Sequence, residues 1–192
     1  MESINMFQGS RVRLTAPRAG DAATMSRWHE DGWFLRLINA STARPQSEAQ
    51  IQAWIDETDK SDHDIVLAVR LVDTDELIGW IELTGILWNC GTTMLGIAVG
   101  DSARWDQGYG REAVELTLRY AFDELNLHRV GLTVFSYNQR AVALYEKLGF
   151  TYEGAQREFL HRGGQRHDMY YYGLLRREWE TRADLDHTPA TI

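Results

Sequence analysis

The chain has 192 residues, 44% hydrophobic and 25% charged, which is typical of one soluble globular domain with a full core. No apolar run approaches the roughly 20 residues that cross a bilayer, and the first ten residues lack the basic and apolar regions of a secretory signal. The net charge of −8 argues against nucleic acid as a main partner, because binding a phosphate backbone needs a basic surface. We therefore expect no membrane and no nucleic-acid partner. The acidity suits a cationic small molecule or peptide, or solubility alone.

The first half of the chain predicts strands and two short helices. Residues 11–17 alternate as a strand does, and Asp21 is a candidate N-cap for a helix that carries Met25 and Trp28. Ser47 and Gln50 have capping-box spacing ahead of a short amphipathic helix. The β-rich runs 64–72 and 76–85 flank Asp-Thr-Asp, which predicts a hairpin, and residues 93–100 predict a further strand.

The second half gives clearer periodic patterns. After Gly110, apolar residues recur at helical spacing, namely Val114, Leu118, Ala121, Phe122 and Leu125. Residues 129–135 alternate as a half-buried strand. Asn138 then caps a helix that Gly149 ends, and residues 157–175 predict two strands around a Gly163-Gly164 turn.

This order of elements predicts an α+β fold, with a mixed, mostly antiparallel central sheet flanked by helices. Hairpins come first, then strand–helix–strand–helix, then another hairpin, which is not the order of a doubly wound sheet. We expect one domain over residues 1–182 and a flexible polar tail over residues 183–192.

The stretch WDQGYGREA at 105–113 contains the pattern G-x-G-x-x-A of a dinucleotide-binding turn. Its context excludes that interpretation, because the turn falls past the middle of the chain and the next strand ends in SYNQR without a carboxylate. No phosphate-binding G-x-x-x-x-G-K-[ST] motif is present either. Gly108 and Gly110 still allow a ligand to approach unpaired amides at a helix N-terminus, although a plain strand-to-helix connection is an equal alternative.

A second segment, NQRAVALYEKLGF at 138–150, decides between these alternatives. Together the two segments resemble the GNAT superfamily of acyl-CoA-dependent N-acetyltransferases. The family's pyrophosphate loop matches Gly108 and Gly110, and its later motif matches Asn138, Ala141, Tyr145, Gly149 and Phe150. Trp105 departs from the pattern, where most members have Gln or Arg. The C-terminal segment resembles the branch of ribosomal-protein alanine and spermidine N-acetyltransferases.

The resemblance implies an acetyl-CoA site in which the sheet is splayed apart. The strand edge at Ile97, Ala98 and Val99 would pair with the pantetheine arm, with Gly96 or Gly100 providing a bulge. The amides of Gln107, Gly108, Tyr109, Gly110 and Arg111 would hold the pyrophosphate, and Asn138 would bind the pantetheine. Tyr145 would protonate the leaving thiolate, although a tyrosine there is more often part of a core.

The general base is less clearly indicated. Glu82 interrupts an apolar strand and could accept a proton from the attacking amine, directly or through water. A carboxylate on the solvated face of a half-exposed strand is the alternative, and Asp101 is a competing candidate. Cys90 is a poor nucleophile candidate, and the six histidines show no metal-ligand spacing, so we expect no metal.

The acceptor pocket of the family implies a role for aromatic side chains, here Trp28, Trp33, Trp54 and Tyr170 to Tyr172, which could also simply pack. We expect the acceptor to be a peptide N-terminus or a small amine, with a polyamine or a non-catalytic acetyl-CoA sensor as alternatives. The single cysteine favours the cytoplasm, and the resembled branch implies a possible homodimer.

Overall fold

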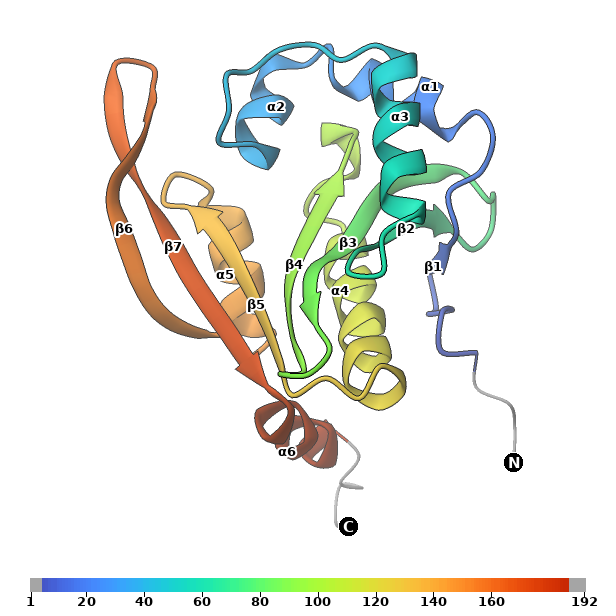
Figure 1. Cartoon of the computed structure of the whole chain (residues 1–192), viewed down its shortest axis with the longest axis vertical. Helices are drawn as coiled ribbons and strands as arrows, with labels where there is room; N and C mark the ends of the chain where they lie inside the picture. The colour runs from blue at the N-terminus through green and yellow to red at the C-terminus, as the bar shows by residue number, and fades with distance from the viewer. Residues whose placement is uncertain (1–4, 187–192) are drawn as a thin grey trace.

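A seven-stranded mixed sheet forms the centre of the computed structural model, which describes residues 5–186 (Figure 1). The strand order is β1-β2-β3-β4-β5-β7-β6, and every neighbouring pair is antiparallel except β4 and β5. The predicted α+β class is therefore confirmed. The strands are β1 (Val12–Thr15), β2 (Ile65–Leu71), β3 (Leu77–Leu87), β4 (Thr92–Val99), β5 (Arg129–Phe135), β6 (Thr151–Arg162) and β7 (Gln165–Leu175).

Helices cover both faces of the sheet and divide the core in two. The larger cluster joins the sheet to α4 and α5, and a smaller one joins it to α1, α2 and α3 on the opposite face. None of the helices within residues 5–186 is long and apolar enough to cross a membrane. The helices are α1 (Asp21–Trp28), α2 (Gly32–Ile38), α3 (Glu48–Asp59), α4 (Tyr109–Arg119), α5 (Gln139–Lys147) and α6 (Arg176–Asp186), with a 3₁₀ turn at Ser102–Arg104 and a π-helical turn at Tyr120–Glu124.

The sheet opens between its two parallel strands. β4 and β5 pair only over Thr92–Met94 and Arg129–Gly131, and then diverge towards the end of the sheet that α2 covers (Figure 1). The strand β4 nevertheless stays paired with β3 as far as Val99. Within the described part of the chain, one edge of β4 is therefore left without a strand partner beyond Met94.

The irregularity in this region lies in β3 and not in β4, where it was expected. The register between β3 and β4 shifts between Thr84 and Leu87, and Gly85 there has the left-handed φ of 59°. The two glycines expected to form a bulge serve close packing instead. A Cβ on Gly96 would lie 2.6 Å from Oε1 of Glu82, and one on Gly100 would collide with the Trp28 ring.

The predicted helix signals are largely confirmed. Ser47 and Gln50 form a reciprocal capping box, Asn138 caps α5, and Gly149 follows that helix with a φ of 87°. The prediction for α1 was wrong by one residue, because Gly20 is its N-cap. Asp21 is instead buried in the first turn, where both of its carboxylate oxygens lie 2.6 Å from Nη2 of Arg70.

Two helices have no counterpart among the predicted elements. The helix α2 fills what appeared to be a connection between two helices, with Phe34 and Leu35 buried. The helix α6 continues to Asp186 and so crosses the boundary expected at residue 182. The remainder of the predicted tail, residues 187–192, lies outside the described residues.

Candidate active site

A cavity of about 1080 Å³ occupies the opening between β4 and β5. It extends from the start of α4, past α5, to the helices that cover the opposite face. Ten of the eleven predicted site residues line it: Glu82, Ile97, Ala98, Val99, Gly108, Tyr109, Gly110, Arg111, Asn138 and Tyr145. The exception is Gln107, whose carbonyl accepts a hydrogen bond from Nη1 of Arg11 at 2.6 Å and whose side chain donates to the Ala103 carbonyl.

The start of α4 presents backbone donors to the cavity. Gly108 is the N-cap, with a left-handed φ of 83° that favours glycine. Tyr109, Gly110 and Arg111 form the first turn, so their amides have no acceptor within the helix. The helix dipole adds a positive potential at the same place. This turn can therefore hold an anionic group such as a pyrophosphate.

The open edge of β4 offers backbone groups from alternate residues. The Gly100 amide bonds to Ile78 of β3, so the backbone groups of Ala98 also point to β3, whereas those of Ile97 and Val99 point to the open edge. Ala98 thus contributes only its side chain to the cavity wall. The Val99 carbonyl is already occupied, because Nε1 of Trp105 donates to it at 2.8 Å.

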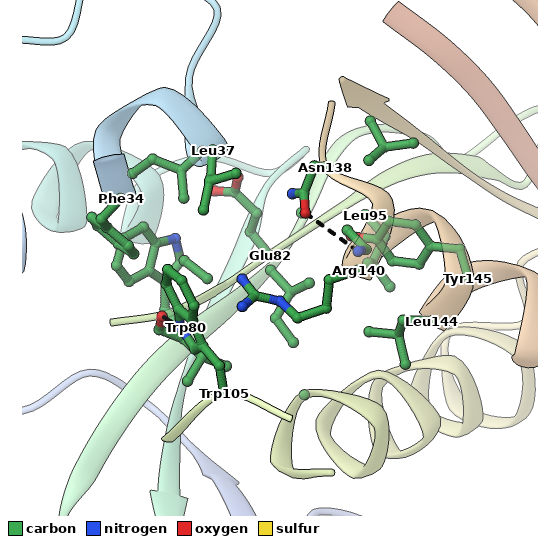
Figure 2. Close-up of a pocket in the computed structure, with 18 of the residues that line it drawn as sticks. Phe34, Leu37, Trp80, Glu82, Leu95, Trp105, Asn138, Arg140, Leu144 and Tyr145 are labelled. Atoms are coloured by element: carbon green, nitrogen blue, oxygen red, sulfur yellow. Dashed lines mark hydrogen bonds between the residues drawn. The ribbon is translucent and has the colours of Figure 1, made fainter. Parts of the chain in front are cut away.

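Asn138 has a hydrogen-bonding group free for a ligand. Its Oδ1 accepts from the Ala141 amide at 3.3 Å and so caps α5. Capping fixes the orientation of the side-chain amide and directs the Nδ2 donors away from the helix. The residue therefore combines a structural role with a position on the cavity wall, as Figure 2 shows.

Tyr145 lies on α5 with only 6% of its surface exposed. Its ring packs edge-to-face on Phe150 with centroids 5.8 Å apart, which fixes its orientation. Burial raises the pKa of the Tyr145 hydroxyl to about 12. The side chain is therefore neutral at physiological pH and has a proton to donate into the cavity that it lines.

Glu82 projects from the centre of β3 into the same cavity. Its partner across the strands is Gly96 of β4, and the absence of a side chain there leaves room for the carboxylate. Burial raises the pKa of Glu82, and repulsion from Asp64 raises it further. A carboxylate with a raised pKa is a stronger base than an exposed one, which suits proton abstraction.

The competing candidates lie elsewhere. The carboxylate of Asp101 accepts from the Ala103 amide at 2.8 Å, caps the 3₁₀ turn and does not line the cavity. Cys90 lies exposed in the turn between β3 and β4. Within residues 5–186 no cluster of His, Cys, Asp and Glu side chains is placed to hold a metal ion.

The opposite end of the cavity is aromatic and apolar. It is lined by His29, Phe34, Leu37, Ile38, Ile51, Trp54 and Trp80. Trp80 is central: His29 stacks on it with centroids 6.0 Å apart, and Phe34 and Trp54 approach it edge-on at 5.9 Å. Of the aromatic residues predicted for this pocket, Trp54 lines it, whereas Trp28, Trp33 and Tyr170 to Tyr172 do not.

The sequence patterns did not indicate a contact between Trp105 and Arg140. The Arg140 guanidinium lies 3.8 Å from the centre of the Trp105 ring, and both residues line the cavity (Figure 2). Trp80 was not predicted to line the cavity either. It lies two positions before Glu82 in β3, so both side chains lie on the same face of the strand. This spacing could have indicated Trp80 from the sequence.

The charge of the cavity is opposite to that of the whole protein. Its lining carries four cationic side chains, Arg104, Arg111, Arg140 and Lys147, against the two carboxylates of Glu82 and Asp106. In a chain of net charge −8, this local excess favours an anionic ligand.

Comparison with known proteins identifies the family. Residues 11–151 match the model of the acetyltransferase (GNAT) domain. The chain is 44% identical over 173 residues to the "Putative ribosomal N-acetyltransferase YdaF" of Bacillus subtilis (strain 168), covering 88% of this chain and 92% of that protein. It is 31% identical to a spermidine N(1)-acetyltransferase of Vibrio cholerae, over 56% of this chain and 62% of that protein.

The fold of a solved structure agrees with this result. A spermidine N-acetyltransferase from Vibrio cholerae, crystallised with CoA and spermine, superposes with a TM-score of 0.81 at 23% identity. The match covers 90% of this chain and 99% of that chain. The chain therefore belongs to the GNAT acetyltransferase family and is an N-acetyltransferase, which moves an acetyl group from acetyl-CoA to an amine.

Proposed function

We propose that the enzyme binds acetyl-CoA along the opening between β4 and β5 and acetylates the α-amine of a peptide or a small amine. The observation that carries this proposal is the single cavity that joins the anion-binding turn of α4 to Glu82 and Tyr145. The amides of Gly108 to Arg111 would hold the pyrophosphate. The open edge of β4 at Ile97 and the amide group of Asn138 would bind the pantetheine arm.

The reaction needs one base and one acid. Glu82 would accept a proton from the ammonium or amine of the acceptor, directly or through water. The nitrogen then attacks the acetyl carbon, an N–C bond forms, and the C–S bond breaks. Tyr145 would donate its proton to the departing thiolate, and the raised pKa of its hydroxyl keeps that proton available. Both groups line one cavity, as direct transfer requires.

The lining favours an α-amine over a polyamine. Among residues 5–186 only Glu82 and Asp106 provide carboxylates to the lining, whereas a polyamine brings several positive charges that would need partners. A polyamine nitrogen also has a pKa near 10.4, against roughly 7.7–8.0 for a peptide α-amine, a difference worth about 3.4 kcal/mol in deprotonation. A peptide N-terminus therefore requires less from one buried carboxylate.

The test is thiol release from acetyl-CoA with a panel of N-terminal peptides, small primary amines and spermidine. We expect the highest kcat/KM for peptides with an apolar first residue, because aromatic side chains line the acceptor end. A clear preference for spermidine would overturn the acceptor assignment. Thiol release at the uncatalysed rate throughout, with tight acetyl-CoA binding, would instead favour a sensor.

We further propose that the enzyme acts in the cytoplasm as a single domain that includes α6, and that it forms a homodimer. The lone, exposed Cys90 is consistent with a reducing compartment. The edge strand β6 carries the exposed aromatic residues Tyr152 and Phe159, which suit burial against a second copy. Light scattering that gives the mass of a monomer would contradict the dimer.

A further inference from the structure

Arg140 spans the opening in which the donor is proposed to bind. It belongs to the first turn of α5, yet its guanidinium rests on Trp105, which precedes α4 on the other side of the opening. Figure 2 shows the side chain reaching across the cavity between Asn138 and Trp105. Trp105 is itself fixed, because its Nε1 donates to the Val99 carbonyl at the end of β4.

The positive charge of Arg140 is poorly compensated. None of the ion pairs formed among residues 5–186 includes Arg140, whereas Arg104 pairs with Glu76 and Arg111 with Glu115. Burial lowers the pKa of the Arg140 guanidinium, and nearby Asp106 offsets this only in part. An arginine nevertheless stays protonated, so a cation is held in the cavity mainly by an aromatic face.

We propose that Arg140 is a ligand of the donor's pyrophosphate, and that it leaves the Trp105 ring when the donor binds. This inference rests on the proposed donor site. Contact with an aromatic face is worth about 0.5–2 kcal/mol, whereas a guanidinium can form two parallel charge-assisted hydrogen bonds with a phosphate. The free amides at the start of α4, in the segment that follows Trp105, place that phosphate within the same part of the cavity.

The decisive comparison uses acetyl-CoA and S-acetylpantetheine, a donor that keeps the acetylated pantetheine arm but lacks the pyrophosphate and the adenosine 3′-phosphate. Calorimetry should show that Arg140→Met weakens acetyl-CoA binding by about tenfold or more, as expected for a hydrogen bond to a charged group. The affinity for S-acetylpantetheine should stay within about twofold of wild type. Arg177→Met, an exposed site on α6, removes the same charge far from the cavity and should change neither affinity.

Equal weakening of both donors by Arg140→Met, or unchanged affinity for acetyl-CoA, would overturn the proposal. Arg140→Gln provides the same readout if the methionine variant does not fold. Wild-type protein that fails to bind acetyl-CoA would instead refute the proposed donor site, so the two failures are distinguishable.

The proposed movement of Arg140 away from Trp105 can be followed by tryptophan fluorescence. Coenzyme A should change the indole fluorescence of the wild type, because Arg140 leaves the Trp105 ring. In Trp105→Phe most of that change should be lost, although the remaining tryptophans are intact. A fluorescence change of wild-type size in Trp105→Phe would show that Arg140 does not leave this ring.

Discussion

The donor end and the acceptor end of the cavity are built from different kinds of structure. At the donor end backbone groups, namely the first amides of α4 and the open edge of β4, are joined by the polar side chains of Asn138 and Arg140. At the acceptor end the lining consists of side chains from separate segments, including Phe34 of α2, Trp54 of α3 and Trp80 of β3. Substitutions should therefore change either the acetyl-CoA affinity or the acceptor KM. The exceptions are Glu82 and Tyr145, which lie where the two ends meet.

Tyr145→Phe should have the largest effect, because it removes only the proton donor and keeps the ring packed on Phe150. General acid catalysis contributes about 10²–10⁴-fold, so kcat should fall by about 10³-fold with little change in KM for acetyl-CoA. Tyr120→Phe is a matched control, since Tyr120 packs against the same core but is only partly buried and does not line the cavity. A Tyr145→Phe enzyme with full kcat would mean that Tyr145 only packs.

Glu82→Gln should lower kcat by about 10²-fold, because the amide cannot accept a proton. In the wild type, kcat/KM should fall as the pH drops through the raised pKa of Glu82, since only the ionised carboxylate is a base. The variant should lose this acid limb. Asp101→Ala, which removes the competing carboxylate, should retain its kcat. A pH profile unchanged in Glu82→Gln would remove Glu82 from the mechanism.

The same pKa shift predicts that this variant folds. A carboxyl group whose pKa is raised by folding stabilises the protein only below its unfolded pKa, and that contribution is lost as the pH rises through the raised value. At neutral pH the ionised Glu82 is therefore unfavourable for folding. Glu82→Gln should melt at the wild-type temperature or above it. A lower melting temperature would show that the carboxylate has a stabilising partner.

The difference between the two ends also explains what the sequence could predict. Gly108, Asn138 and Tyr145 lie in short motifs whose local geometry follows from residue type, so most of the donor end and the order of strands were predictable. The acceptor wall depends on which helices pack on β3, and α2 was not predicted because its 7 residues are too short a run to show a helical period. The Arg140–Trp105 contact joins segments 35 positions apart in numbering, so no local spacing indicates it.

Gly108→Val tests the donor end alone. A β-branched residue at a φ of 83° costs about 1–3 kcal/mol, so the turn should distort and the acetyl-CoA affinity should fall about tenfold or more. The KM of the acceptor should change little. Gly163→Val introduces a similar strain at a φ of 58° in the β6–β7 turn, away from the cavity, and should leave the affinity unchanged. Calorimetry that finds wild-type affinity in folded Gly108→Val would contradict the assignment of this loop.

Trp54→Leu tests the acceptor end alone and should have the smallest effect. The change keeps an apolar side chain but removes the edge-on contact with Trp80, and aromatic pairs contribute about 0.5–1.5 kcal/mol. Since 1.36 kcal/mol corresponds to a factor of ten, the acceptor KM should rise about fivefold while acetyl-CoA affinity stays constant. Trp33→Leu is the matched control, because Trp33 is 51% exposed and does not line the cavity. The acceptor KM of both variants is measured from initial rates at saturating acetyl-CoA. If Trp33→Leu raised the acceptor KM more than Trp54→Leu, the acceptor would bind at the surface of α2 and not in the cavity.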